Sequence, residues 1–196
     1  MTNLKRTRDD ILASILETVH RKGFNATGLS ELFAVSGASS GSFYNYFHSK
    51  HELGHALIDF EWKKLQENIL EPAFREPGTP TDQILAMLNR LEAKQLAKPN
   101  CAGCLLGNLI VDLVEQDESF RTHLIAVFDE WEQRIADALS SDRSQVAPDK
   151  VAEQLITFIE GVMLLGRLHR DPSRVRRGFE AARDLVQPSV KTQIPV

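Results

Sequence analysis

The chain has 196 residues, of which 42% are hydrophobic and two are cysteines. It is therefore long enough for one domain or two small ones, and it is unlike a secreted scaffold held by disulfides. The formal net charge is −4, but residues 1–55 carry six Lys/Arg against five Asp/Glu and the remainder carries seventeen against twenty-two, which favours the N-terminal end for an anionic partner.

Neither a membrane segment nor a leader peptide is expected. No run of 18 apolar residues occurs, which excludes a transmembrane helix. The first 20 residues are briefly basic and then amphipathic, without the apolar stretch and cleavage site of a signal peptide. We therefore expect a cytoplasmic protein with no membrane partner.

The N-terminal region shows helical periodicity. Its first apolar residues recur with helical spacing and form one stripe, made by Ile11, Leu12, Ile15, Leu16 and Val19. Gly23 suits the end of that helix. Short helices are predicted at about 28–35 and 39–45, and Ser36-Gly37 separates them.

The fourth helix has a clear start. Ser49 and Glu52 stand at the N-cap and N3 positions of a capping box. The apolar spacing that follows predicts a helix over 49–71. The Pro/Gly-rich stretch 72–80 is predicted to be an interhelical loop.

The rest of the chain also has helical periodicity, with breaks at Pro99, Pro148 and Pro172. The predicted helices are 81–97, 104–116, 118–140, 149–169 and 172–186. The tail, 189–196, is expected to be loose. Because no strand alternation is visible, the expected fold class is all-α.

The segment from Thr27 to Lys50, TGLSELFAVSGASSGSFYNYFHSK, predicts a helix-turn-helix. In such a unit the second helix lies in the major groove of DNA. Small hydroxyl residues near its start suit phosphate contacts at a helix N-terminus, and Gly41 suits close approach to DNA or to a neighbouring helix. The residues expected to contact DNA are Thr27, Ser39, Ser40, Gly41, Ser42, Tyr44, Asn45, Tyr46 and Lys50.

The run GASSGSFYNYFHSKHEL resembles the signature of the TetR family of bacterial transcriptional regulators. The matching positions are Gly37, Ser39, Gly41, Ser42, Phe43, Tyr44, Tyr46, Phe47 and Lys50. Ser40 stands where the family commonly has Lys, which removes a cation near phosphate; Lys5, Arg6 and Arg8 are candidates to compensate.

The resemblance implies a DNA-binding domain of three helices at 1–50 and a helical ligand-binding and dimerisation domain at 51–188, with helix 49–71 connecting them. It implies a non-enzymatic repressor without a cofactor, which binds palindromic double-stranded operator DNA as a homodimer. Release would follow binding of a small molecule or a thiol-reactive electrophile.

The sequence His51-Glu52-Leu53-Gly54-His55 also matches H-E-x-x-H, the zinc metalloprotease motif, and a protease is the alternative function. The competing interpretation needs no metal: Glu52 completes the helix cap, Leu53 packs inward and both histidines lie on an outer face near DNA. A third ligand is expected in a zinc protease, but His123 and His169 lie far along the chain in separate helices. We therefore expect no metal site.

Cys101 and Cys104 form a CxxC at the start of a predicted helix. A thioredoxin motif needs a βαβ context, and a zinc site needs two further ligands. The remaining interpretations are a sensing thiol, because a helix N-terminus should lower a thiol pKa, and two packed apolar side chains. CxxCLLGNL resembles a TetR subgroup of N-ethylmaleimide-responsive and related repressors, in which a cysteine at the place of Cys104 reacts.

The remaining candidates line a ligand site or an interface. Asn108 follows Cys104 by one turn, and Trp131 and Phe158 are candidate pocket residues. The last two helices are expected to form a four-helix bundle with a second subunit. The expected interface residues are Leu155, Ile159, Val162, Met163, Val175 and Phe179.

Overall fold

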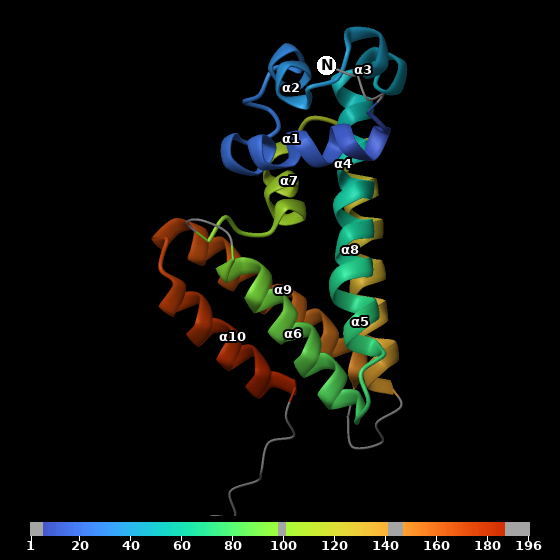
Figure 1. The fold of residues 1–196 in the computed structure, drawn as a ribbon. Coiled ribbons are helices and arrows are strands. Elements are labelled where there is room, and N and C mark those ends of the chain that lie inside the picture. Colours follow the sequence, from blue (N-terminus) through green and yellow to red (C-terminus); the bar gives the residue numbers. More distant parts are fainter. Residues whose placement is uncertain (1–5, 98–100, 141–146, 187–196) are drawn as a thin grey trace, which may run out of the picture. The chain divides into compact units, whose positions relative to one another are not determined.

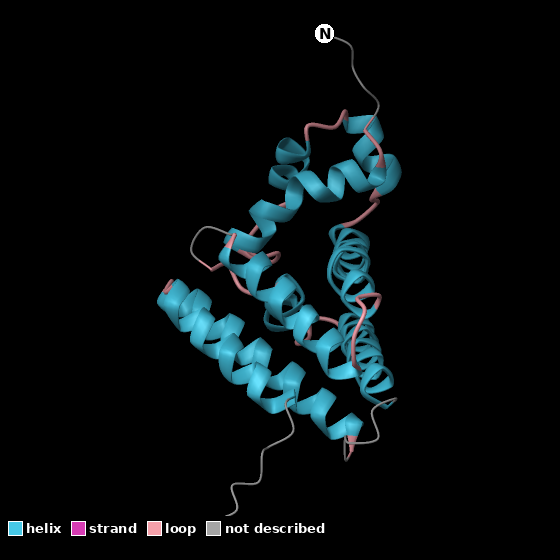
Figure 2. Cartoon of the chain, turned by 60° about the horizontal axis from the view of Figure 1, so that its bottom comes forward, coloured by secondary structure: helices cyan, strands magenta, loops and turns pink. Residues whose placement is uncertain are grey.

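The computed structural model describes residues 6–97, 101–140 and 147–186, and every regular element in these ranges is a helix (Figures 1 and 2). The all-α fold class is therefore confirmed. Lys5 and the tail expected to be loose, 189–196, lie outside the described residues. In the described part of the chain, no helix combines the length and the apolar character needed to span a membrane.

The helices group into two compact units that do not follow the order of the sequence. The first unit combines the chain up to Leu65 with Cys104–Val127, and the second combines Gln66–Gly103 with the chain from Phe128 onward. Helix α8, Glu118–Ser140, contributes residues to both units.

The first unit is built around α1, Arg8–Lys22, which begins at a full capping box between Thr7 and Asp10. Its apolar stripe is completely buried at Ile11, Leu12 and Ile15, as the periodicity predicts. Helix α1 packs against α2, Leu29–Ser36, and α4, Lys50–Leu65. Helix α3, Ser40–Tyr46, follows the turn at Gly37, which has a left-handed φ of 62°.

The helix predicted over 49–71 continues further than expected but changes its winding. A π-helical turn, Gln66–Leu70, follows α4, and a short α5, Glu71–Phe74, follows the turn. Pro72 lies in the first turn of α5, where a missing backbone N–H is tolerated. The loop predicted over 72–80 is therefore wrong at its start, because Pro72 lies in the first turn of a helix that continues to Phe74.

Helix α7, Leu105–Leu113, and the first turns of α8 complete the first unit. The apolar face of α7 is buried at Leu105, Leu106 and Leu109. Helix α7 packs against α4.

The second unit contains α6, Pro80–Leu96, the end of α8, α9, Pro148–His169, and α10, Pro172–Val186. Helix α10 packs against both α9 and α6. Glycines permit the close crossing of α9 and α10: a Cβ atom added at Gly166 would lie 2.6 Å from Val175 Cγ2, and one added at Gly178 would lie 2.5 Å from Val162 Cγ1.

Candidate nucleic-acid interface and sensing residues

Helix α3 is held from one side by aromatic rings. The Ser39 hydroxyl caps the helix and accepts from the Ser42 backbone N–H at 3.2 Å. Phe43 and Phe47 are completely buried, and their ring centroids lie 5.6 Å apart. Phe33 on α2 contacts Phe43 at 5.5 Å. Phe43 and Phe47 therefore belong to the core.

The opposite face of α3 is open. Ser40, Gly41, Tyr44 and Asn45 are exposed, and Tyr44 is 43% exposed. Apart from its chain neighbours and the backbone of α3 itself, no described atom lies within 4 Å of the position that a Cβ atom at Gly41 would take. A close contact with a neighbouring helix therefore does not explain this glycine within the described chain. These four residues form a small, largely polar surface that a major groove can accept.

Two other residues expected at this interface are turned inward. Ser42 is half-buried, and its Oγ is enclosed without a hydrogen-bond partner in the described part of the chain. Tyr46 is half-buried with its ring 6.3 Å from that of Phe47. Both lie closer to the core than the sequence suggested, because a seven-residue helix presents only one narrow face outward.

Thr27 and Lys50, both expected to contact DNA, have intramolecular contacts. Thr27 is completely buried and donates from its hydroxyl to the Gly23 carbonyl at 2.7 Å. Lys50 donates to the Asn25 carbonyl at 3.1 Å and lies 5.0 Å above the Phe24 ring. Burial lowers the pKa of Lys50, and nearby Asp112 opposes that shift. Both residues therefore shape the loop before α2.

The same loop is tied to α7. Asp112 Oδ2 accepts from the Phe24 backbone N–H at 2.7 Å, and the Asn25 side chain donates to the Asp112 carbonyl. No local pattern predicts this contact, because 88 residues separate Phe24 from Asp112.

The N-terminal arginines lie beside the helix-turn-helix. The Arg6 guanidinium rests against the turn, so that a Cβ atom on Gly37 would lie 3.2 Å from Arg6 Nη2. The Arg8 guanidinium lies 5.6 Å from the centroid of the Phe47 ring. Positive charge is therefore present next to α3 even though Ser40 carries none.

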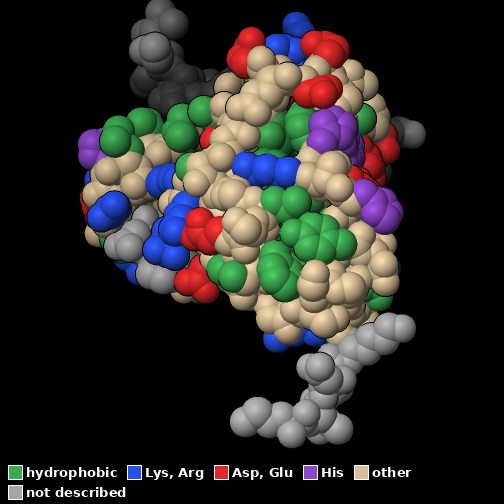
Figure 3. Space-filling view, turned by 90° about the horizontal axis from the view of Figure 1, so that it is seen from above, with side chains coloured by type: hydrophobic (Ala, Val, Ile, Leu, Met, Phe, Trp, Pro, Cys, Tyr) green, Lys and Arg blue, Asp and Glu red, His purple; other side chains and the backbone are tan. Residues whose placement is uncertain are grey.

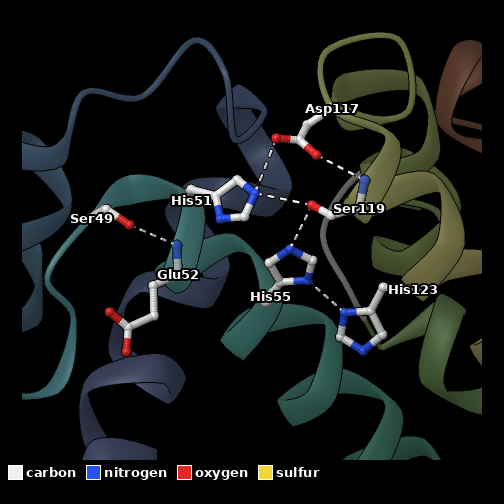
Figure 4. Close-up of polar contacts among 7 residues, drawn as sticks. All are labelled: Ser49, His51, Glu52, His55, Asp117, Ser119 and His123. Carbon is white, nitrogen blue, oxygen red and sulfur yellow. Dashed lines mark hydrogen bonds and ion pairs between the residues drawn. The ribbon is translucent and has the colours of Figure 1, made fainter.

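The two histidines of the H-E-x-x-H sequence face the start of α8, where His51 is exposed and His55 is half-buried (Figure 4). His51 Nε2 and His55 Nε2 lie 3.0 Å and 3.1 Å from the Ser119 hydroxyl. Glu52 points away from both, because its carboxylate accepts from the His48 backbone N–H at 2.9 Å. The Ser49 hydroxyl caps the Glu52 N–H as predicted, whereas the reciprocal bond goes to His48.

This geometry removes the basis for a zinc protease. The glutamate that would serve as general base belongs to a helix cap, on the side of α4 away from the histidines. Among the residues that the structure describes, no group of three or more His, Cys, Asp or Glu side chains is arranged to hold a metal ion.

The CxxC residues have different environments. Cys101 is buried in a left-handed backbone conformation with a φ of 48°. Cys104 is half-buried and is the N-cap of α7, where its Sγ accepts from the Gly107 N–H at 3.5 Å. Asn108 is half-buried one turn further along. Cys104 thus occupies the helix N-terminus that the sequence indicated.

The residues proposed for a ligand pocket differ in their exposure. Trp131 is completely buried. Phe158 is 37% exposed and lines an open groove of about 500 Å³ along α9 and α10, together with Gly161, Leu165, Arg174 and Arg177. Phe158 therefore lies on an outer face of α9, in an open groove.

The apolar stripe assigned to the dimer interface is the core of a single chain. Five of its six members are at most 2% exposed, namely Leu155, Ile159, Met163, Val175 and Phe179. Val162 is half-buried and packs on Gly178. The exposed stripe of α9 lies on its other side and consists of Phe158, Leu164, Leu165 and Leu168.

Comparisons with known proteins agree with this architecture. Residues 11–57 match the model described as bacterial regulatory proteins of the tetR family, and residues 80–182 match that of the tetracyclin repressor-like C-terminal domain. An uncharacterized HTH-type transcriptional regulator of Lactococcus lactis is 28% identical over 180 residues, covering 91% of this chain and 92% of that protein. The transcriptional repressor DhaR of Mycobacterium sp. strain GP1 is 25% identical, covering 87% of each chain.

The chain is also similar to the Escherichia coli transcriptional repressor NemR. The two sequences are 28% identical over 116 residues, covering 59% of this chain and 58% of NemR. The crystal structure of the reduced form of NemR aligns with a TM-score of 0.77 at 24% identity, over 93% of this chain and 98% of that one. The chain belongs to the TetR family of transcriptional regulators, which are DNA-binding proteins and not enzymes.

Proposed function

We propose that the protein is a cytoplasmic repressor that binds palindromic operator DNA as a homodimer and is released by a small-molecule or thiol-reactive inducer. Two relatives, DhaR and NemR, are named as repressors. DNA contact falls to the exposed face of α3, through Ser40, Gly41, Tyr44 and Asn45, and Arg6 supplies charge beside it.

Gly41 is the observation that carries this proposal. Glycine in a helix lowers stability by about 0.5–1 kcal/mol relative to alanine. Apart from the neighbouring residues and the backbone of α3 itself, nothing in the described chain lies within 4 Å of the position of an added Gly41 Cβ atom, so intramolecular packing does not repay that loss. A groove of DNA pressed against α3 accounts for it, because even one methyl group would then separate the surfaces.

The test separates folding from DNA binding in one variant. DNA recognised by the wild-type protein is first selected from a random duplex library. Gly41→Ala should then raise the melting temperature, because alanine favours the helix, while weakening binding to the selected DNA by about tenfold or more, roughly 1.4 kcal/mol. Unchanged DNA affinity in the stabilised variant would remove Gly41 from the interface, and failure to select any DNA would contradict the function.

The exposed stripe of α9 supports dimerisation. Leu164 and Leu168 are 58% and 72% exposed, although large apolar side chains seldom cluster on a monomer surface. With the adjoining surface of α10, they would form a four-helix bundle with a second copy. Recognition of a palindrome requires the recognition helices of the two copies to lie about 34 Å apart, at the spacing of successive major grooves.

Cys104 is the proposed sensing thiol. A helix N-terminus favours a thiolate, and Cys104 is partly accessible whereas Cys101 is buried. The Cys104 sulfur caps the helix that carries Asp112, and Asp112 holds the loop before α2. Adding a group to this sulfur removes the cap of α7 and thereby disturbs the support of the helix-turn-helix.

A further inference from the structure

Three histidines join α4 to the beginning of α8, within the first unit. His55 Nδ1 lies 2.8 Å from His123 Nδ1, and His123 Nε2 lies 2.9 Å from Asp59 Oδ1. At the other end, His51 Nε2 lies 3.2 Å from Asp117 Oδ2. Together with the Ser119 hydroxyl, these groups form a chain of contacts between two carboxylates, part of which Figure 4 shows. The space-filling view of Figure 3 likewise shows histidine side chains bordering acidic ones on one face.

The partners assign the protons of this network. The Asp59 carboxylate accepts from His123 Nε2–H, which leaves His123 Nδ1 as an acceptor when the ring is neutral. His55 therefore donates from Nδ1–H to His123 and presents the lone pair of Nε2 to the Ser119 hydroxyl. Only one proton fits between two nitrogens 2.8 Å apart. The His55–His123 pair can thus carry a charge of zero or +1 in this arrangement, but not +2.

The histidine contacts coincide with a close approach of the two helices. A Cβ atom at Gly54 would lie 2.8 Å from Phe120, so this glycine lets the buried Phe120 ring sit directly on α4. The rings of His51 and His55 lie against Phe120, with centroids at 4.8 Å and 4.4 Å. A second positive charge in this stack would separate the start of α8 from α4.

The same turn of α4 supports the end of α3. The Ser49 hydroxyl accepts from the Glu52 backbone N–H, and the Glu52 carboxylate accepts from the backbone N–H of His48, which follows shortly after the recognition helix. Displacement of the first turns of α4 therefore reaches the residues that follow Phe47.

We propose that His51, His55 and His123 form a proton-sensitive latch, which closes α4 onto the start of α8 when the His55–His123 pair shares one proton position and opens in acid when both rings are protonated. The latch concerns the first unit by itself; its effect on DNA binding rests on the proposed function. It is a regulatory device distinct from the cysteine thiol.

The charged groups around His55 set the direction of the response. His51 and Asp59 face it from α4, and Asp117 and His123 face it from the α7–α8 turn and α8. Burial lowers the pKa of His55 from its usual 6.5, His123 and His51 lower it further, and the two carboxylates oppose them. Because the closed form binds fewer protons than the open one, closure is complete above about pH 6.5 and is lost as the pH falls below it.

Histidine-ring NMR of the full-length protein without DNA tests the latch. As the pH falls from 8 to 5, the His55–His123 pair should take up its second proton. The contact between the His55 and Phe120 rings should be lost over the same pH range. The ratio of open to closed forms should rise by up to about tenfold per pH unit for the one excess proton. Independent protonation of both rings with the Phe120 contact intact would overturn the proposal.

His123→Gln is the informative variant. Its amide oxygen can accept from His55 in either protonation state, so the Phe120 contact should persist at pH 5. His169→Gln, an exposed histidine at the end of α9, should open like the wild type. Opening of His123→Gln at the wild-type pH would refute the latch. If that variant does not fold, His55→Phe, which keeps a ring on Phe120, serves in its place with the same expected result.

Binding to the DNA selected as above separates the two proposals. Wild-type affinity should fall by up to about tenfold per pH unit below pH 6.5, and the affinity of His123→Gln should fall less. If the ring contacts open but the two proteins lose DNA affinity equally, the latch does not control DNA binding. If no DNA is bound at any pH, the proposed function fails while the NMR result stands by itself.

Discussion

The crossing of α9 and α10 allows a packing prediction to be worked from the structure. In Gly166→Ala the new methyl carbon would lie 2.6 Å from Val175 Cγ2, well inside van der Waals contact. Val175 is 1% exposed and β-branched, so it cannot rotate away cheaply. Overpacking costs about 1–3 kcal/mol, whereas replacing a helical glycine gains about 0.8–1 kcal/mol. The net result should be a loss of roughly 1 kcal/mol.

A double-mutant cycle isolates that clash. Val175→Ala alone should cost about 2 kcal/mol through the cavity that it leaves. In the double variant the added methyl occupies part of that cavity, so the combined loss should be smaller than the sum by about 1–2 kcal/mol. Urea unfolding at one fixed protein concentration measures all four species. Additive losses, or a Gly166→Ala variant stabilised as much as the open-site control Gly41→Ala, would show that the helices do not cross this closely.

Three further outcomes are expected. Asp112→Ala should lower the free energy of unfolding by about 1.5–3 kcal/mol, because it leaves the buried Phe24 N–H without its acceptor. Asp112→Asn should lower that free energy less, and urea unfolding measures both variants. Leu168→Glu should weaken dimerisation by at least about tenfold in sedimentation, and an unchanged dimer would place the interface elsewhere. N-ethylmaleimide should abolish DNA binding of the wild type and of Cys101→Ser but not of Cys104→Ser; loss in all three would eliminate Cys104.

The helices were predictable because their signals are local. Hydroxyl caps, the glycine stops at Gly23 and Gly37 and the proline at the start of α10 act within a turn of the residue that carries them. The identity of the DNA-binding unit also followed from a short segment. The π-helical turn before Pro72 was missed, because a change of winding leaves no mark in apolar spacing.

The errors in the site share another cause. Periodicity locates an apolar face but does not tell which neighbour covers it, so the inner stripe of α9 at Leu155 and Ile159 was mistaken for the subunit interface. Likewise, the distance of His123 along the chain argues against a contact with His55, yet their Nδ1 atoms lie 2.8 Å apart across 68 residues of sequence. Such contacts depend on helix packing, which one sequence read alone does not specify.

The open glycine of α3 also affects how this protein can be engineered. Random substitution screened for heat resistance should enrich changes at Gly41, because there the folded chain gains helix stability and meets no steric opposition. Each of these stabilising substitutions would add a side chain to the face of α3 that we propose contacts DNA. The most thermostable variants would then include regulators that fold well and control nothing, so a stability screen on this scaffold requires a parallel selection for repression.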